Sequence, residues 1–343
     1  MAQRDISFGS FNLYNLQLAG QPMYSGSRWS EAEYEAKVFY TGAVLYRIQA
    51  DVVGFQELWA GAALEEAMSV AGMEDSHTAL VPPGHPGTRI TCAGLVRNGI
   101  LEGEPEWITD FPEEMMLASG GDDPQQDRIA VALTTFSRPV LHFTVRPHPD
   151  TPLIHVFVCH FKSRRPTELW REDWYERDVH KPHLNALGYA VSTIRRTAEA
   201  TALRMLITNI TKGTNTPVVV IGDMNDGKLS NTLNILSEQP QYLTGLSEGG
   251  GDNALYTAQT LQEYRSTRDV YYTHVFKKER ESLDHILFSQ EFYDHSKKRL
   301  WAFDEMTVDN DHLNLEDHKA SGTNDHGILR VGFKWKPAEG ALA

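Results

Sequence analysis

The chain has 343 residues, 41% of them hydrophobic, and a formal net charge of −14 at neutral pH. This length and apolar content suffice for one large domain, or two ordinary ones, with a substantial core. The negative charge opposes a general electrostatic hold on nucleic acid. It does not exclude a nuclease, because a bound divalent cation and a local basic patch can supply positive charge where it is needed.

Two further features of the sequence indicate the cellular compartment of the protein. Cys92 and Cys159 lie in apolar, strand-like runs, where a thiol is usually a small buried hydrophobic group, so we expect neither a disulfide framework nor a zinc site. The N-terminus has no apolar h-region, and no apolar stretch is long enough to span a bilayer. We therefore expect a soluble, cytoplasmic protein without a membrane span. The sequence does not predict its oligomeric state.

The N-terminal third predicts strands and helices that alternate. Residues 6–12 form an alternating strand that ends at Asn12, and apolar residues at three- and four-residue spacing predict a helix over 31–49. Residues 51–57 form a buried strand that ends at Glu57. A carboxylate there is costly unless it is paired or bound to a cation, although a surface glutamate at the start of a loop is the simpler alternative.

The pattern in the middle of the chain predicts mostly β-strands. After a short helix over 64–71 come strands over 88–96, 129–136, 140–146 and 153–160, with 101–127 irregular and acidic. His160 ends the last of these strands. Residues 164–185 break the rhythm, because they combine tryptophans with charges of both signs, and we interpret them as an excursion from the core. A long helix is predicted over 187–210.

The strongest strand in the sequence is followed by a group of acids and amides. Residues 217–222 hold a run of β-branched residues and end at a glycine, after which come Asp223, Asn225 and Asp226. An Asx turn is the plainer interpretation of this group, and a site for a metal or a polar substrate is the alternative. Further strands are predicted over 270–276, 283–289 and 328–333. Strands dominate, with helices between some of them, which favours one domain of sheets packed on each other with helices outside.

The ordered motifs resemble those of the endonuclease/exonuclease/phosphatase superfamily. They are Phe-Asn-Leu at 11–13, Gln-Glu at 56–57, Phe-Ser-Arg-Pro-Val at 136–140, Cys-His-Phe-Lys-Ser at 159–163, Gly-Asp-Met-Asn at 222–225, Leu-Asp-His-Ile-Leu at 283–287 and Asn-Asp-His at 324–326. The resemblance implies a four-layered α/β/β/α sandwich of two packed mixed sheets flanked by helices. It also implies one catalytic domain over 1–343, with an insertion at about 164–185. Two positions depart from the pattern: Asn324 replaces the usual serine of the last motif, and Tyr14 stands where some abasic-site enzymes have a second metal-binding acid.

The resemblance also implies roles for individual residues in the hydrolysis of a phosphoester. Glu57 would be the main ligand of Mg²⁺ or Mn²⁺, with Asn12 and Asp325 beside it. Asp223 would orient or deprotonate the attacking water, and Asn225 would hold that water or the phosphate. His326 would act as a cationic donor held by Asp284, and His160 would donate to a phosphate oxygen. Nearby cations at Asp223 should keep its carboxylate ionised at neutral pH.

Cations near the histidine strand are the candidates for substrate binding. Arg138 is the better candidate for the phosphate-binding arginine, Arg128 is the second, and Lys162 follows the histidine strand directly. We interpret Arg164 and Arg165 as part of a solvated loop.

The substrate stays open between a nucleic acid, either DNA or RNA, and a small or lipid-derived phosphoester. Aromatic and cationic residues interleaved in 164–185 favour the nucleic acid, whereas the net charge opposes it. A binding module without catalytic activity is a further alternative, which the intact set of acids and histidines disfavours.

Overall fold

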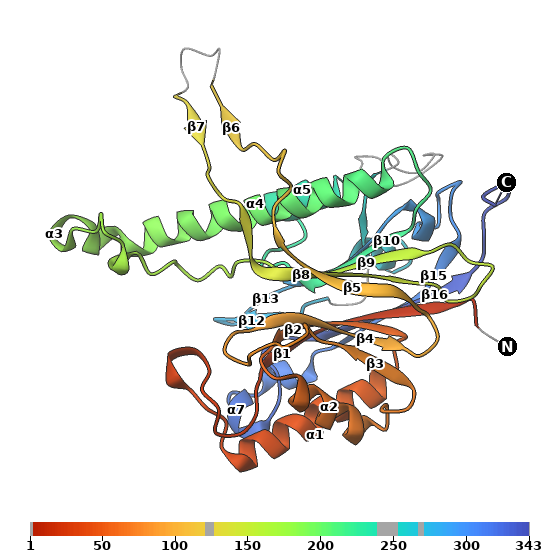
Figure 1. Ribbon diagram of the computed structural model, residues 1–343, viewed down its shortest axis with the longest axis horizontal. Coiled ribbons are helices and arrows are strands. Elements are labelled where there is room, and N and C mark those ends of the chain that lie inside the picture. Colours follow the sequence, from red (N-terminus) through yellow and green to blue (C-terminus); the bar gives the residue numbers. More distant parts are fainter. Residues whose placement is uncertain (1–2, 121–126, 239–252, 267–270, 343) are drawn as a thin grey trace.

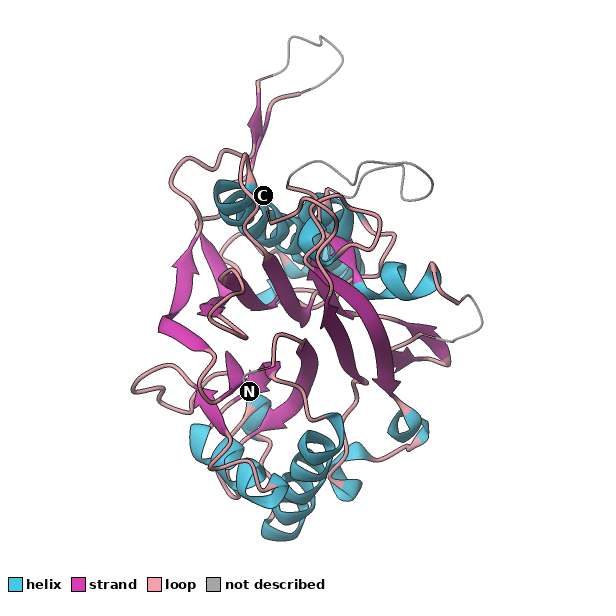
Figure 2. Ribbon diagram, turned by 90° about the vertical axis from the view of Figure 1, so that its right-hand side faces the viewer, coloured by secondary structure: helices cyan, strands magenta, loops and turns pink. Residues whose placement is uncertain are grey.

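The computed structural model describes residues 3–120, 127–238, 253–266 and 271–342. Within these residues, two six-stranded mixed sheets pack face to face, and helices cover the outer side of each sheet (Figure 1). The view along the layers shows strands in the middle, with helices above and below them (Figure 2). The four-layered α/β/β/α sandwich predicted from the motifs is confirmed.

The first sheet has the strand order β15-β16-β1-β2-β4-β3. Its central strands β1 and β2 are parallel, and the other neighbouring pairs are antiparallel. Helices α1 and α2 lie on its outer side, and the short α7 lies beside α1 (Figure 1). The bounds are β1 (Ile6–Leu16), β2 (Val52–Leu58), β3 (His77–Leu80), β4 (Thr91–Arg97), β15 (Trp301–Asp309), β16 (Ile328–Trp335), α1 (Glu31–Ile48), α2 (Gly61–Ala71) and α7 (His318–Ser321).

The second sheet has the strand order β11-β14-β10-β9-β8-β5, with β9 and β10 parallel. Helices α4 and α5 cover its outer side (Figure 1). The bounds are β5 (Leu101–Asp110), β8 (Thr135–Val145), β9 (Ile154–His160), β10 (Val218–Asp223), β11 (Tyr256–Thr257), β14 (Asp284–Phe288), α4 (Leu184–Thr211) and α5 (Asn231–Ser237). The remaining elements are two small ribbons, β6 (Ala118–Ser119) with β7 (Ile129–Ala130) and β12 (His274–Phe276) with β13 (Glu279–Glu281), and helices α3 (Arg177–His180) and α6 (Ala258–Glu263).

Three apolar layers hold the sandwich together. One lies between the two sheets and contains Phe8, Val158 and Ile221. A second packs α1 and α2 onto the first sheet, and a third packs α4 onto the second sheet. The backbones of the two sheets come close at Gly54, where an added Cβ would lie 2.7 Å from a methyl of Ile221. Burial of these faces fixes the register of both sheets, because a one-residue slip would turn each apolar face to solvent.

Several predicted elements differ from those observed. The stretch predicted to be irregular contains the ten-residue β5, which pairs with β8 at the edge of the second sheet. Its Pro105 and its exposed acids are tolerated because an edge strand leaves one side of its backbone unpaired. The strands predicted over 129–136 and 140–146 differ as well, because β7 is only two residues long and β8 runs without a break through Pro139. Strands β3 and β15 were not predicted.

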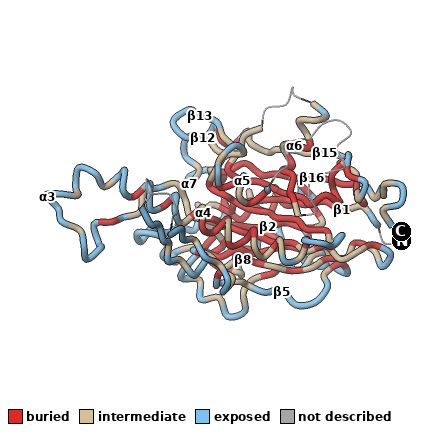
Figure 3. The backbone as a smooth tube through the Cα atoms, turned by 90° about the horizontal axis from the view of Figure 1, so that it is seen from above, coloured by how far each residue is buried: buried red, intermediate tan, exposed pale blue. Residues whose placement is uncertain are grey.

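The predicted excursion is an arm that projects beyond the body of the molecule. It comprises the short η2 (Leu169–Arg171), α3 and the first turns of α4, and it extends past the sheets on the same side as the β12–β13 ribbon (Figure 1). Seen from above, the arm is largely exposed, whereas the sheets are buried (Figure 3). Residue 270, at which the strand over 270–276 was predicted to begin, lies outside the described residues.

Candidate active site

Polar residues from both sheets meet at one end of the sandwich. Asn12 of β1 pairs with Gln56, next to Glu57 in β2, while His160 of β9 is opposite Asp223 of β10. From the motifs, each polar residue of the site is expected to follow the C-terminal end of a strand. Asp284 instead begins β14, opposite Asp223, and His326 precedes β16. Because β14 and β16 run antiparallel to their neighbours, their starts reach the same rim as the other strands' ends.

A buried chain of three residues lies at the centre of the site. His326 Nδ1 lies 2.8 Å from Asp284 Oδ2, and its Nε2 lies 3.9 Å from Asp223 Oδ2. Burial lowers the pKa of His326, but the charges of Asp284 and Asp223 outweigh it and raise the pKa well above the usual value. The imidazole is therefore protonated at neutral pH, with one N–H held by Asp284 and the other free to face a substrate oxygen.

The second histidine has the opposite electrostatic setting. His160 Nε2 lies 3.5 Å from Asp223 Oδ2, and its Nδ1 has no hydrogen-bond partner among the described residues. Burial, followed by the charges of Arg138 and His326, lowers the pKa of His160 well below its usual value. The site thus pairs a neutral histidine with a protonated one, and Asp223 lies between them.

Asp223, between the two histidines, has a raised pKa. Burial raises its pKa to about 7, and Asp284 adds to the rise, while His326 lowers it. In the protein alone, desolvation raises this pKa more than the charge of His326 lowers it, and the expectation that a nearby cation keeps Asp223 ionised stays a prediction. Asn12 donates its amide Nδ2–H to Asp223 Oδ2 at 3.1 Å, and the Asn225 backbone N–H donates to Oδ1 at 2.8 Å.

Two residues of the candidate site have strained backbones. Glu57 has a φ of 62° and Asn225 a φ of 50°, in the left-handed region that non-glycine residues seldom occupy. Asn225 is held there by its side chain, whose Nδ2–H donates to the carbonyl of Phe161 at 3.1 Å. Backbone strain of this kind persists where the surroundings fix it, and it clusters at functional sites.

A second group of acidic residues lies on the part of the rim that the first sheet forms. Glu57 Oε2 accepts the backbone N–H of Asn15 at 3.1 Å. Burial, followed by the charge of Asp325, raises the pKa of Glu57. Asn12 is 1% exposed and pairs across β1 and β2 with Gln56, next to Glu57. Carboxylate and amide oxygens are the hard donors that Mg²⁺ and Mn²⁺ take, so the chemistry of Glu57, Asp325 and Asn12 fits such an ion.

A different triplet places its ligand atoms closest together. Oxygens of Asp223 and Asp284 and a nitrogen of His326 all lie within 4.8 Å of one another. His326 Nδ1 is hydrogen-bonded to Asp284, its Nε2 lies 3.9 Å from Asp223, and its pKa is raised, so we interpret this triplet as an imidazolium between two carboxylates. A protonated imidazole has no lone pair for a metal.

The candidate phosphate-binding cations are positioned by a carboxylate of helix α4. Glu199 accepts the backbone N–H of Ser137 at 2.8 Å and that of Lys162 at 2.7 Å, and so ties β8 to the end of β9. Arg138 donates to the Phe161 carbonyl at 3.3 Å, and its charge acts on both His160 and Glu57. Arg128 is exposed beside β7, away from this rim, so the structure favours Arg138. Glu199 was not predicted, because a single acid in a long helix is usually solvated.

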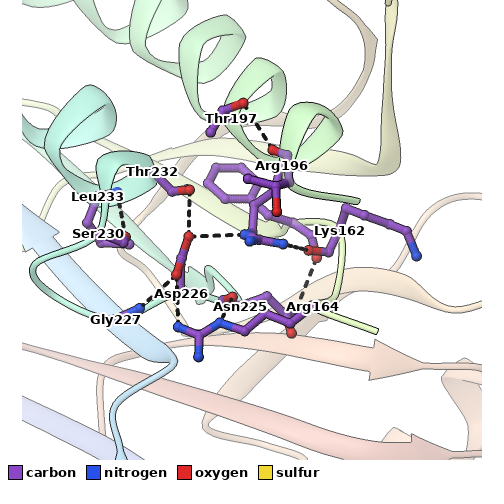
Figure 4. Close-up of polar contacts among 12 residues, drawn as sticks. Lys162, Arg164, Arg196, Thr197, Asn225, Asp226, Gly227, Ser230, Thr232 and Leu233 are labelled. Atoms are coloured by element: carbon purple, nitrogen blue, oxygen red, sulfur yellow. Dashed lines mark hydrogen bonds and ion pairs between the residues drawn. The ribbon is translucent and has the colours of Figure 1, made fainter. Parts of the chain in front are cut away.

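Arg164 is not part of a solvated loop. Its guanidinium binds Asp226 at 2.8 Å and Glu281 at 2.6 Å, and its Nε donates to the Asn225 carbonyl at 3.0 Å. Asp226 also binds Arg196 of α4 at 3.1 Å, as Figure 4 shows. This network joins the base of the arm to the loop of Asn225. The neighbouring Arg165 is exposed, as expected.

A buried lysine supports the opposite side of the site. Lys37 of α1 is fully buried, and its ammonium donates to the side-chain oxygen of Asn324. The amide of Asn324 in turn donates to the backbone carbonyl of Asn12. Burial lowers the pKa of Lys37 to about 7. Asn324, which replaces the expected serine, thus bridges two motifs that are more than 300 residues apart.

Comparisons with solved structures give neighbours over almost the whole chain. The catalytic domain of human Nocturnin with a bound sulfate anion has 14% identity and a TM-score of 0.53, covering 97% of this chain and 96% of that one. Humanized D. rerio TDP2 has 14% identity and a TM-score of 0.56, covering 97% and 100%. The Bacteroides thetaiotaomicron mannosyl-6-phosphatase has 13% identity and a TM-score of 0.52, covering 96% and 100%. At these identities the likeness concerns the fold alone.

The sequence comparisons add a family but no individual relative. No curated protein matches the chain. None of the helices in the described residues is both long and apolar enough to cross a membrane. The sequence profile of the Endonuclease/Exonuclease/phosphatase family matches residues 10–321, which is most of the chain and includes the strand-end residues from Asn12 to Asp284. The chain belongs to the endonuclease/exonuclease/phosphatase family.

Proposed function

We propose that residues 1–343 act as one catalytic domain that hydrolyses phosphoesters with Mg²⁺ or Mn²⁺, and that the substrate is a phosphodiester of DNA or RNA. The observation that carries the proposal is the buried His326, protonated between Asp284 and Asp223. A fixed cationic donor beside a carboxylate base is what in-line attack of water on phosphorus requires, because negative charge grows on the phosphoryl oxygens.

Each residue at the rim has a role in this reaction. Asp223 orients the attacking water and takes up its proton as the new P–O bond forms. His326 donates its Nε2–H to a phosphoryl oxygen, and Asp284 keeps the ring oriented and protonated. His160, which is neutral, donates one N–H to a second oxygen. The old P–O bond breaks opposite the water, and the leaving oxygen receives a proton from solvent.

Glu57, Asn12 and Asp325 would hold the metal. When bound, the ion supplies positive charge to the substrate's phosphate oxygens. Asn225 holds the water or the phosphate. Its own position is fixed, because its backbone N–H donates to Asp223 and its side chain donates to the Phe161 carbonyl. Arg138 and Lys162 bind the substrate phosphate from the side of β8 and β9, where Glu199 holds the backbones of Lys162 and of Ser137, which precedes Arg138.

The alternative substrate is a small or lipid-derived phosphoester, for which the chain would act as a phosphatase or phosphodiesterase. The net charge of −14 favours it, because a negatively charged protein repels a polyanion over a distance. The mannosyl-6-phosphatase among the structural neighbours shows that this fold can carry a phosphatase. We place a nuclease first because cations and exposed aromatic residues lie on the arm and on the β12–β13 ribbon.

One panel of substrates separates these possibilities. Plasmid DNA, single-stranded RNA, bis-p-nitrophenyl phosphate and inositol phosphates would each be incubated with Mg²⁺ or Mn²⁺, with Asp223→Asn purified in parallel as the control. Cleavage of a nucleic acid by the wild type alone supports the nuclease. Release of phosphate from inositol phosphates alone supports the alternative, and no cleavage of any substrate contradicts the proposal.

A further inference from the structure

Thr273 contacts the backbone on both sides of the Asp284–His326 pair, although it belongs to none of the sequence motifs. It lies directly before β12 and is 1% exposed. Its Oγ1 accepts the backbone N–H groups of Leu283 at 3.0 Å and Asp284 at 3.1 Å. Its backbone carbonyl accepts the N–H of Gly327, the residue after His326, at 2.6 Å. One buried residue therefore ties together the two segments that carry the pair.

The two members of the pair come from different sheets. Asp284 is the first residue of β14 in the second sheet, whereas His326 precedes β16 in the first sheet. The 2.8 Å contact between His326 Nδ1 and Asp284 Oδ2 therefore bridges the sandwich. Apolar packing between the sheets is non-directional, so it does not by itself fix a hydrogen-bond distance. A contact that ties the two backbones to each other supplies this constraint.

The Thr273 hydroxyl supports the start of β14 at a place that its neighbouring strand does not reach. On one side, β14 pairs with β10, with Asp284 opposite Asp223. On the other side it pairs with β11 at Leu287 and Phe288, at the far end of the strand. Next to Asp284 the hydroxyl takes the place of such a strand, because it accepts N–H groups beyond the end of β11.

The segment of His326 is held by the same stretch of chain. His274, which follows Thr273, forms an antiparallel backbone bridge with His326, and the centroids of their rings lie 5.1 Å apart. An added Cβ at Gly327 would lie 3.2 Å from the Cα of Thr273, so the two backbones approach closely here. The backbone of Thr273 and His274 thus sets the place from which the His326 side chain emerges.

The β12–β13 ribbon holds Thr273 itself in place. The Thr273 N–H donates to the carbonyl of Glu281 at 3.1 Å. The carboxylate of Glu281 accepts both terminal N–H groups of Arg164, at 2.6 and 2.7 Å. Arg164 also donates to the Asn225 carbonyl at 3.0 Å. The support of the pair therefore continues through the ribbon to the loop of Asn225.

We propose that Thr273 is a positioning residue, whose hydroxyl and carbonyl keep Asp284 and His326 within hydrogen-bonding distance of each other. This inference rests on the proposed function, in which His326 is the cationic donor. The plainer role of Thr273 is to satisfy buried N–H groups and so to stabilise the fold. The two roles have different consequences, because the plainer one affects stability alone, whereas positioning affects turnover in a protein that stays folded.

Substitutions at Thr273 and at a second buried threonine separate these roles. Thr273→Val keeps the shape and removes the acceptor, so kcat should fall roughly a hundredfold, the cost of a displacement of about 1 Å near the reacting groups. Thr273→Ser keeps the hydroxyl and should restore kcat to within about threefold of the wild type.

Thr151→Val is the matched control. Thr151 is 2% exposed, and its Oγ1 accepts the backbone N–H of His148 at 3.2 Å. It lies before β9, at the opposite end of that strand from His160. The same change of side chain is therefore made far from the rim, and it should lower the melting temperature without lowering kcat.

Steady-state kinetics on a substrate that the wild type cleaves measures kcat and KM, and melting curves report the fold. The loss in Thr273→Val should lie in kcat with little change in KM, because Arg138 and Lys162 are held by other strands. Thr273→Ala, which leaves space for a water in place of the hydroxyl, replaces Thr273→Val if the latter does not fold, and it should also lose turnover. Equal losses of kcat in the variants of Thr273 and Thr151, or no recovery in Thr273→Ser, would overturn the proposal.

Proton magnetic resonance tests the pair without any substrate. An imidazolium N–H that is bound to a carboxylate gives a far-downfield proton signal, and His326→Ala identifies the signal that belongs to His326. This signal should move or vanish in Thr273→Val and persist in Thr273→Ser and Thr151→Val. An unchanged signal in Thr273→Val overturns the positioning role while the proposed function stands. A wild type that cleaves no substrate overturns the proposed function, and the same signal then decides whether Thr273 holds the pair.

Discussion

The rim of the sandwich and the arm depart from the usual rule of burial in opposite directions. At the rim, Asp223, Asp284 and His326 are charged or chargeable groups that are almost fully buried. On the arm, Trp170, Leu187 and other large apolar groups are exposed. A domain stable in water tolerates such positions only where another contribution offsets their cost, and so both regions mark contacts with other molecules.

The free-energy cost of burying charged groups at the rim is offset by contacts within the protein. The cost of exposing apolar groups on the arm is not offset in this way. Asp284 accepts the Nδ1–H of His326, and Asp223 accepts two N–H groups, one from Asn12 and one from Asn225. By contrast, Leu187, Val191 and Ile194 of the arm stay 36–46% exposed. The difference is that the polar groups of the rim are fixed by contacts within the protein, as the proposed chemistry requires, whereas the apolar groups of the arm are not covered by the described residues. The predictions below test each side of the contrast.

Removal of the divalent metal should have the largest effect. After dialysis against a chelator, activity should fall to background and return with Mg²⁺ or Mn²⁺, because the ion that Glu57, Asn12 and Asp325 would hold supplies positive charge to the phosphate. Glu57→Gln should weaken the response to metal more than it lowers the melting temperature. Full activity in excess chelator would show that the metal assignment is wrong.

Loss of either histidine should lower turnover by roughly two to four powers of ten, the usual range for a positioned acid, base or donor. His326→Ala removes the cationic donor, and His160→Ala removes a neutral donor on the other side of Asp223. Steady-state kinetics on the cleaved substrate measures both. Circular dichroism and melting curves serve as the control, since each variant should keep the fold. Near-normal turnover of one variant would remove that residue from the mechanism.

Asp223→Asn should be the variant least rescued by added metal. The amide keeps the shape of the side chain, and its oxygen can still accept the hydrogen bond from Asn12. The amide cannot take up a proton from water. A lost metal ligand weakens affinity, so excess Mn²⁺ should partly restore Glu57→Gln. Titration of both variants with both metals compares them. Recovery of Asp223→Asn at high metal, with none for Glu57→Gln, would reverse the two roles.

The pH profile should change in Asp284→Asn. Burial lowers the pKa of His326, but Asp284 and Asp223 raise it well above the usual value, so the donor is charged at neutral pH and activity falls as pH rises through this pKa. Removing the Asp284 charge lowers the pKa, and the alkaline limb of kcat should move to lower pH. The stability that the pair contributes has the same sign, since it is present at low pH and is lost as pH rises through the folded-state pKa. An unshifted alkaline limb would mean that another group sets it.

Replacing the tip of the arm should have the smallest effect on the chemistry. A short Gly/Ser connector in place of residues 168–181 leaves Arg164, its ion pairs and α4 intact. Hydrolysis of bis-p-nitrophenyl phosphate should stay within about twofold, while preference among large substrates changes, because the tip contains no residue of the rim. Equal loss on small and large substrates would show that the tip supports the core. Arg164→Met is the contrasting variant, since it breaks the network that holds the loop of Asn225.

The fold could be predicted to a large extent from local patterns. Apolar runs and helical spacing identified β1, α1, β10 and the long α4, because these depend on residues close in sequence. The edge strand β5 was missed because its Pro105 and exposed acids resemble a loop. An edge strand gains its stability from pairing with β8, which no local pattern records.

The sequence by itself predicted, from the order of motifs between Asn12 and His326, candidate residues that the structure brings to one rim, but it did not predict Glu199, which holds the backbones of Ser137 and Lys162. Only the tertiary structure decided their chemical states. Burial raises the pKa of Asp223 to about 7, and burial with the charges of Arg138 and His326 lowers the pKa of His160 well below its usual value. Arg164 became part of an ion-pair network because Asp226 and Glu281 approach it from distant segments. Leu187, Val191 and Ile194 of α4 have the spacing of an ordinary core stripe in the sequence, and only their place beyond the sheets leaves them exposed.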